Sequence, residues 1–214
     1  MIFRRVLGPI AVVLFGLLPA LCAGQSFDQL LKATDAGDIK AVGAFLDKGL
    51  EPNTADPQGN TLLMIASRQG HLELVKFLIS RKASVARRSP HGDTALMMAS
   101  LGGHLAVARL LVDNGAQINH EGWAPLHYAA FEGGPALVKF LVGKGADKDG
   151  LAPNGYTPLM LATMKGQIES VRALLVEDVD LSLRNPKGQT ALGIAKEKNN
   201  AEMVTLLRRA GVVD

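Results

Sequence analysis

Short runs of apolar residues at helical spacing, separated by polar turns, recur along most of the chain. The segment Trp123–Val142 shows the pattern clearly, with Leu126 and Ala129 on one apolar face and Leu137 and Leu141 on a second. A Gly-Gly turn separates the two faces, so the segment predicts a pair of short amphipathic helices. Neither helix can bury its apolar face alone. The pattern therefore predicts helix pairs that stack on neighbouring pairs.

The same apolar segment occurs five times at a nearly constant spacing. It begins at Thr61, Thr94, Ala124, Thr157 and Thr190, which gives spacings of 33, 30, 33 and 33 residues. A turn glycine follows at a fixed distance in four of the five segments, at Gly70, Gly103, Gly133 and Gly166. A more polar unit, from Phe27 to Gly49, precedes them, as expected of a terminal unit with one side in water.

These segments resemble the ankyrin repeat, whose pattern is T-P-L-H-x-A with a period near 33 residues. The match rests on T-L-L-M-I-A from Thr61, A-P-L-H-Y-A from Ala124 and T-P-L-M-L-A from Thr157, and it covers about residues 26–211. The resemblance implies an all-α solenoid of about six helix-turn-helix units joined by β-hairpin finger loops. The predicted units lie at about residues 26–59, 60–92, 93–122, 123–155, 156–188 and 189–214. The loop at 119–122 is three residues shorter than the others, which predicts a notch beside Trp123.

The first residues have the pattern of a targeting sequence. Arg4 and Arg5 precede the apolar run Val6–Ala20, and small residues follow up to Gly24. This pattern predicts a secretory signal peptide at residues 1–23, cleaved after Ala23, with the repeat domain at 24–214. The alternative is an uncleaved anchor. We therefore expect an exported protein, periplasmic in a bacterial host and otherwise secreted, with no integral membrane span after cleavage.

The composition narrows the function classes. The chain has 23 basic and 20 acidic residues, and removal of Arg4 and Arg5 leaves 21 against 20, a balance that argues against nucleic acid as a partner. The one cysteine, Cys22, falls within the predicted signal peptide. No phosphate-binding loop, HExxH or GxSxG motif is present. We accordingly predict a protein that is not an enzyme and that uses no cofactor and no metal.

Several residues that attract attention have structural roles in this interpretation. The signature threonines are predicted to cap first helices. His71, His104 and His127 occupy histidine positions of the ankyrin pattern, whereas Met64, Met97 and Met160 replace the signature histidine in other units. His91 and His120 are expected at exposed finger tips. The basic residues from Arg81 to Arg88 are interpreted as a solvated loop, with binding to an anionic partner surface or to phospholipid headgroups as the alternatives.

The residues that the repeat does not explain suggest a binding site. In ankyrin arrays the partner-binding face comes from the fingers and from the exposed side of the first helices. At the corresponding variable positions the middle of this chain has an apolar strip, made of Leu101, Trp123, Phe131, Tyr156 and Met164. Arg68, Glu132 and Lys165 are predicted to add charge specificity. An exposed aromatic cluster with a polar rim is typical of a recognition site. The alternative is that Trp123 and Tyr156 pack over adjacent fingers.

The resulting functional hypothesis is an exported binding module that engages a protein partner through its concave face. The combination of export and repeats resembles periplasmic bacterial ankyrin-repeat proteins. Two roles follow as hypotheses: an inhibitor or immunity protein against a toxic enzyme, or a stabilising partner of an envelope enzyme. The alternative is self-assembly, with the strip buried in a homo-oligomer.

Overall fold

Within residues 20–132, 134–176 and 178–211, which a computed structural model of the chain describes, twelve α-helices follow one another in pairs. The first helices of the pairs are α1 (Ala20–Asp35), α3 (Leu62–Gln69), α5 (Ala95–Leu101), α7 (Pro125–Glu132), α9 (Pro158–Met164) and α11 (Ala191–Glu197). The second helices are α2 (Ile39–Asp47), α4 (Leu72–Ser80), α6 (Leu105–Asp113), α8 (Pro135–Gly143), α10 (Ile168–Leu174) and α12 (Ala201–Arg209). The predicted all-helical class is confirmed.

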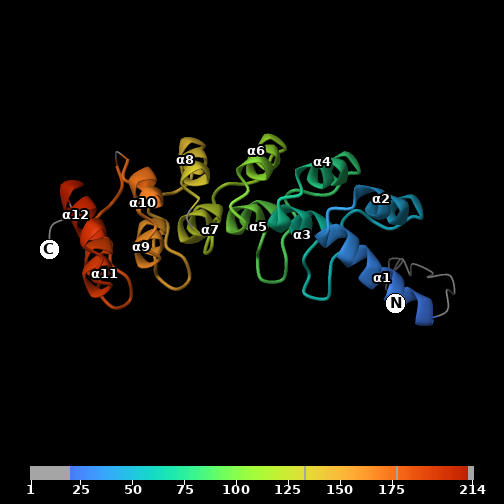
Figure 1. Ribbon diagram of the computed structural model, residues 1–214, viewed down its shortest axis with the longest axis horizontal. Coiled ribbons are helices and arrows are strands. Elements are labelled where there is room, and N and C mark those ends of the chain that lie inside the picture. Colours follow the sequence, from blue (N-terminus) through green and yellow to red (C-terminus); the bar gives the residue numbers. More distant parts are fainter. Residues whose placement is uncertain (1–19, 133, 177, 212–214) are drawn as a thin grey trace, which may run out of the picture.

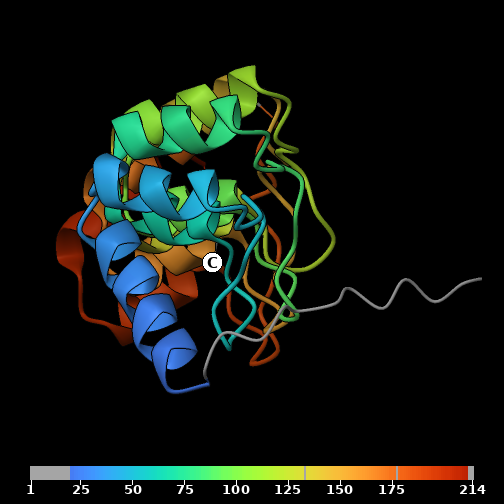
Figure 2. The same ribbon diagram turned by 90° about the vertical axis from the view of Figure 1, so that its right-hand side faces the viewer.

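The pairs stack side by side along the long axis of the molecule (Figure 1). Helices α3, α5, α7, α9 and α11 contact one another in that order and form a first-helix layer. The second helices form a parallel row, in which α4, α6, α8 and α10 contact in sequence. The loops project on the other side of the first helices (Figure 2). Each unit therefore packs mainly on its neighbours in sequence, as expected of a solenoid.

The core lies between the two helix layers and repeats with the chain. In α3, α5, α7, α9 and α11 the equivalent leucine is almost fully buried, at Leu63, Leu96, Leu126, Leu159 and Leu192. These residues occupy the third position of the repeated apolar segment. Matching positions bury matching side chains, because each unit presents the same face to the next one.

The predicted helix signals behave as expected. The hydroxyl of Thr61 accepts a hydrogen bond from the Met64 amide at 3.2 Å, and the other signature threonines cap α5, α9 and α11 in the same way. Gly70 closes α3 with a φ of 77°, a left-handed conformation that favours glycine. The corresponding Gly133 lies outside the described residues.

The loops differ from the expected β-hairpins. In the described residues, the β-pairing in these loops is limited to one isolated antiparallel bridge, between Ala55 and Thr61. Each of the four longer loops has the same two backbone bonds, in the first loop from the Asp56 amide to the Asn60 carbonyl and from the Gly59 amide to the Asp56 carbonyl, each at 2.9 Å. Pro57 lies inside the turn that these bonds close. The loops project as turns instead of paired strands.

The predicted signal peptide falls largely outside the described residues. Helix α1 begins at Ala20 and so includes the predicted cleavage position after Ala23. Among the described helices, none is long and apolar enough to cross a membrane.

Candidate functional site

Three neighbouring first helices carry the residues of the predicted strip. Leu101 ends α5, Phe131 lies in α7, and Met164 ends α9, while Trp123 and Tyr156 directly precede the caps of α7 and α9. Since α5 contacts α7 and α7 contacts α9, the fold brings the five residues onto one surface. We call this surface, together with Tyr128 of α7, the central patch. Its side chains are half-buried, and hence less exposed than predicted.

Trp123 is held by ring contacts within its own unit. Its ring centroid lies 5.4 Å from that of Tyr128, with the planes tilted by 32°. The edge of a second ring, that of His127, lies at a centroid distance of 5.8 Å. Trp123 therefore packs on its own first helix, which holds the indole in one place and leaves part of it in solvent. A preoriented, half-exposed aromatic ring costs little conformational entropy when it binds a partner.

Tyr128 is a residue of this surface that the sequence analysis missed. Its hydroxyl donates a hydrogen bond to Asp93 Oδ1 at 3.0 Å. Burial, followed by the charge of Asp93 and this hydrogen bond, raises the pKa of Tyr128 to about 12. Its position three residues before Phe131 places both side chains on one helix face, and this spacing is the signal that was available in the sequence.

Phe131 and Lys165 were predicted separately and meet in the structure. The Lys165 Nζ lies 4.4 Å from the centroid of the Phe131 ring, a cation–π distance that joins α7 to the end of α9. Glu132 is exposed beside them. The central patch thus ends at a cation and an acid on its α9 side, which fits the prediction that charges border the apolar strip.

Arg68 does not join the central patch. It lines a separate hollow of about 560 Å³ on the same face, towards the N-terminal end. The apolar floor of this hollow comes from Leu31, Met64, Ile65 and Met98. The hollow was not predictable from the sequence, because it depends on how three first helices and the loop before α3 leave space between them. We refer to it as the N-terminal hollow.

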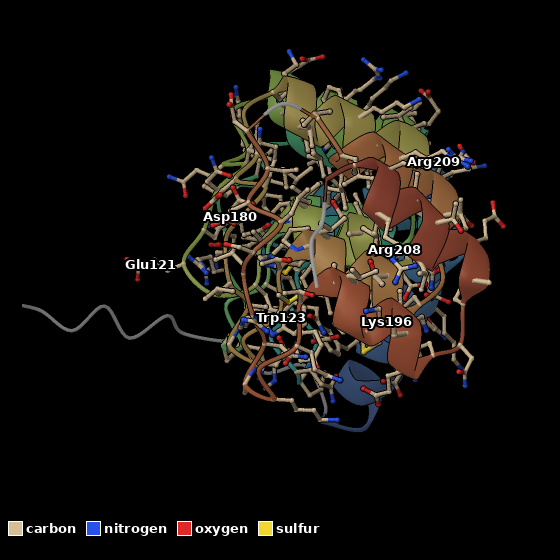
Figure 3. All side chains as sticks on the ribbon, turned by 90° about the vertical axis from the view of Figure 1, so that its left-hand side faces the viewer. Glu121, Trp123, Asp180, Lys196, Arg208 and Arg209 are labelled. Atoms are coloured by element: carbon tan, nitrogen blue, oxygen red, sulfur yellow. The ribbon has the colours of Figure 1, made fainter. Side chains whose placement is uncertain are left out.

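The shortened loop leaves a second hollow, of about 430 Å³, next to Trp123. Gly122, Ala124 and His127 line it, and Leu151, which is 51% exposed, lies on its rim. Figure 3 shows Glu121 and Trp123 on the loop side of the molecule, whereas Arg208 and Arg209 lie on the helix side. The hollow fits the predicted notch, but its described lining does not include Trp123.

His127 is engaged inside the protein. Its Nδ1 accepts a hydrogen bond from the Ala124 amide at 3.1 Å, and its Nε2 lies 2.9 Å from the Gly150 carbonyl, to which it donates. Two such bonds require the neutral ring with the proton on Nε2. Burial lowers the pKa of His127, which favours the same form. The predicted structural role of this histidine is therefore supported by its partners.

His71, His104 and His120 also have local partners, whereas His91 is exposed, as expected of a loop tip. The Nε2 atoms of His71 and His104 lie 2.7 Å and 2.9 Å from carbonyl oxygens at the end of the preceding first helix, those of Asp35 and Arg68. They link adjacent units, as a structural role requires. His120 is half-buried and not at an exposed tip, because the shortened loop holds it close to the body of the repeat array.

The basic loop is partly neutralised by its neighbours. Arg81 forms an ion pair of 2.7 Å with Asp47 and lies 4.9 Å from the centroid of the Phe77 ring. Arg88 donates through Nε to the Gly92 carbonyl at 3.0 Å. These contacts favour the interpretation of this segment as a solvated structural loop.

In residues 20–132, 134–176 and 178–211, no three His, Cys, Asp or Glu side chains converge in a way that suits a metal ion.

Sequence comparison identifies the repeat that builds this surface. The family model for ankyrin repeats (3 copies) matches residues 30–122, 82–151 and 126–213. A search of curated protein sequences finds no match to the chain. Ankyrin repeats act as modules for protein–protein interaction and generally serve as scaffolds without catalytic activity. Matches that extend over residues 30–213, on a stack of helix pairs with the expected caps and turns, show that the chain belongs to the ankyrin-repeat family.

Proposed function

We propose that the protein is an exported binding module that holds a protein partner on its concave face, with the central patch at the centre of the contact. The observation that carries this proposal is the Trp123–Tyr128 ring pair, half-exposed on the surface of neighbouring helices that also carries Leu101, Phe131 and Met164. Aromatic side chains at the centre of a surface dominate the energy of many protein interfaces.

The charged residues support a defined orientation of the partner. Lys165 is fixed over the Phe131 ring, and Asp93 is fixed by Tyr128. Charges that the protein itself positions favour specificity, because a wrongly charged partner meets them without compensation. Arg68 and Glu132 extend this rim beyond the patch.

The test is capture of partners from the exported fraction of the host, with the wild type beside Trp123→Ala/Phe131→Ala. We expect a protein that is retained by the wild type and lost from the variant. Equal retention by both would place the binding site elsewhere. Circular dichroism and thermal unfolding must first show that the variant is folded.

A matched control changes exposed apolar residues outside the patch. Leu151→Ser/Val176→Ser alters two side chains that are 51% and 39% exposed. We expect this variant to retain the partner. If it loses the partner as well, general surface hydrophobicity and not the patch explains the capture.

Within this proposal the partner is an enzyme, which the protein inhibits or stabilises. Adding purified protein to the captured enzyme separates the two roles, since an inhibitor lowers its activity and a stabiliser raises its unfolding temperature. A mass in solution that rises with concentration, with no captured partner, would favour self-assembly instead.

Export is tested independently by the N-terminus of the protein recovered from the host. We expect the mature chain to begin at Gly24, as the residues before it predict. A chain that keeps Met1 and stays inside the cell would contradict this part of the proposal without affecting the binding site.

A further inference from the structure

We propose that the N-terminal hollow is a subsite for an acidic segment of the partner protein, which places an apolar side chain on the floor and carboxylates against Lys32 and Arg68. The inference rests on the proposed binding function and specifies the chemistry of the partner. It rests on a difference between the acidic and the basic side chains of this hollow. Within the described residues the acids have hydrogen-bond partners and the cations do not.

The acids of the hollow are already engaged inside the protein. Asp56 Oδ1 accepts hydrogen bonds from the backbone amides of Gln58 at 2.9 Å and Asn60 at 2.7 Å, and its Oδ2 accepts one from the Asn60 side chain at 3.0 Å. Asp35 Oδ1 accepts a hydrogen bond from the side chain of Gln69. Both oxygens of Asp56 are therefore occupied before any partner arrives.

The cations of the hollow have no such partners. Within the part of the chain that the structure describes, neither the Lys32 ammonium nor the Arg68 guanidinium takes part in an ion pair or a side-chain hydrogen bond. Lysine and arginine together offer eight N–H donors and no acceptor. A ligand that satisfies them must bring acceptors, and carboxylates form the strongest such bonds.

The floor selects an apolar group between these cations. Leu31, Met64, Ile65 and Met98 line it, and the two methionines can adapt to side chains of different shape. A volume of about 560 Å³ lies within the range of about 300–1,000 Å³ that is typical of ligand pockets. The hollow thus has room for a bulky side chain together with its backbone.

The position of the hollow favours a protein segment as the occupant. Helix α5 contributes Met98 to the hollow and Leu101 to the central patch, so the two surfaces are separate but adjacent along one helix. A partner segment that covers the central patch can extend along the same face into the hollow. A small acidic amphiphile would satisfy the same chemistry, and the experiment must separate it from a peptide.

The experiment uses three fluorescent peptides that share a Leu-Phe centre and differ in its flanks, which are acidic in one, basic in the second and Ser-Gly in the third. Fluorescence anisotropy with the purified protein measures their affinities. We expect the acidic peptide to bind at least about ten-fold more tightly than the basic one, with a preference that weakens as salt is added. Equal affinities would overturn the inference.

Charge reversal provides the decisive variant. Lys32→Glu/Arg68→Glu should invert the preference, so that the basic peptide binds more tightly. The matched control is Lys40→Glu/Lys139→Glu, which makes the same change in net charge on the exposed second helices α2 and α8 and should leave the preference unchanged. A preference that persists in the first variant, or disappears in the control, would contradict a specific subsite.

A second variant tests the floor without changing charge. Ile65→Trp places a larger side chain in the hollow, at the position that Tyr128 occupies in α7, and it should weaken the acidic peptide at least about ten-fold. Unchanged binding would place the peptide elsewhere. If dodecanoate displaces the peptide and binds as tightly as it does, the occupant is a small amphiphile and the inference fails.

The inference and the proposed function fail in different ways. If the peptides do not discriminate but Trp123→Ala/Phe131→Ala still loses the captured partner, the patch binds and the hollow does not. If the peptides discriminate but the patch variant keeps the partner, the hollow is the binding surface and the proposal for the patch is wrong.

Discussion

The units built around α3 and α7 place different side chains at the same three positions of one face. Counted from the residue that caps each helix, these are the position before the cap and the fourth and seventh positions after it. Helix α7 has Trp123, Tyr128 and Phe131 at these positions, and α3 has Asn60, Ile65 and Arg68. The three aromatic side chains fill the face of α7 with rings, whereas the smaller and more polar set leaves the N-terminal hollow beside α3. One scaffold thus yields a filled patch and a hollow, and the two differ in the size and the polarity of the side chains at these positions.

The largest expected effect comes from exchanging the two sets. Trp123→Asn/Tyr128→Ile/Phe131→Arg gives α7 the residues of α3. We expect the free energy of unfolding to fall by about 3 kcal/mol, because ring contacts and apolar burial are lost. Denaturant unfolding followed by circular dichroism measures this change.

The reverse exchange sharpens the comparison. Asn60→Trp/Ile65→Tyr/Arg68→Phe should change the free energy of unfolding by less than about 1 kcal/mol, since it fills space on the surface, and it should abolish binding of the acidic peptide. If both exchanges destabilise the protein equally, the two faces do not differ in the way described here.

The next effect concerns pH, because α7 has His127 where α3 has Met64. Burial lowers the pKa of His127 from its ordinary value of 6.5, so the unfolded chain binds a proton at a higher pH than the folded chain does. The stabilisation from the neutral ring is therefore complete above about pH 6.5 and is lost as the pH falls through the folded pKa, by at most about 1.4 kcal/mol per pH unit. His127→Met should flatten this slope when unfolding is measured as a function of pH.

His120 must be controlled in that measurement. Burial and the nearby charge of Arg88 also lower the pKa of His120, so this side chain adds to the same acid slope. His120→Gln should remove the contribution of His120 to the acid slope and leave the contribution of His127. A slope in His127→Met equal to that of the wild type would show that His127 does not titrate differently in the folded state.

A smaller effect is expected at the hydrogen bond that fixes Tyr128. Asp93→Asn removes the charge that the hydroxyl faces, so the pKa of Tyr128 should fall below about 12 while burial keeps it raised. The free energy of unfolding should fall by about 1–1.5 kcal/mol, because the asparagine oxygen still accepts the hydrogen bond but carries no charge. Phenolate absorbance during an alkaline titration measures the first change, and an unaltered titration would rule out the contact.

The smallest expected change in the free energy of unfolding comes from a buried hydroxyl group in α3. Ser67 of α3 is fully buried, and within the described residues its hydroxyl has no hydrogen-bond partner, whereas α7 has Ala130 at the same position. Ser67→Ala should raise the free energy of unfolding by about 1 kcal/mol, because an unsatisfied buried hydroxyl is removed. Ser100→Ala is the control, since Ser100 Oγ donates to the Leu96 carbonyl at 2.8 Å and its loss should not stabilise.

Much of the fold was predictable because its causes are local. Thr61 and Gly70 mark the start and end of a helix through groups only a few residues away, and these marks recur with the repeat. The buried leucines follow from the same period. Of the paired strands expected in the loops, the described residues show one isolated bridge, between Ala55 and Thr61.

The candidate site was predictable only in part. Trp123 and Phe131 stood out because the repeat does not require them, and both belong to the α7 unit, which places them on one surface. The contact between Phe131 and Lys165 and the bond from Tyr128 to Asp93 each join two units, so no single unit of the sequence contains them. Arg68 was predicted as a contact residue, but its place in a separate hollow was not.

The sequence by itself determined the repeat, the order of the helices and the residues that line one face, because a constant period forces equivalent positions into equivalent places. The tertiary structure alone decided which of these residues touch and where space remains between them. The physical reason is that hollows and side-chain contacts depend on where side chains from helices of adjacent units meet. That meeting joins Phe131 to Lys165 and Tyr128 to Asp93, and among the described residues it leaves Lys32 and Arg68 unpaired above an apolar floor.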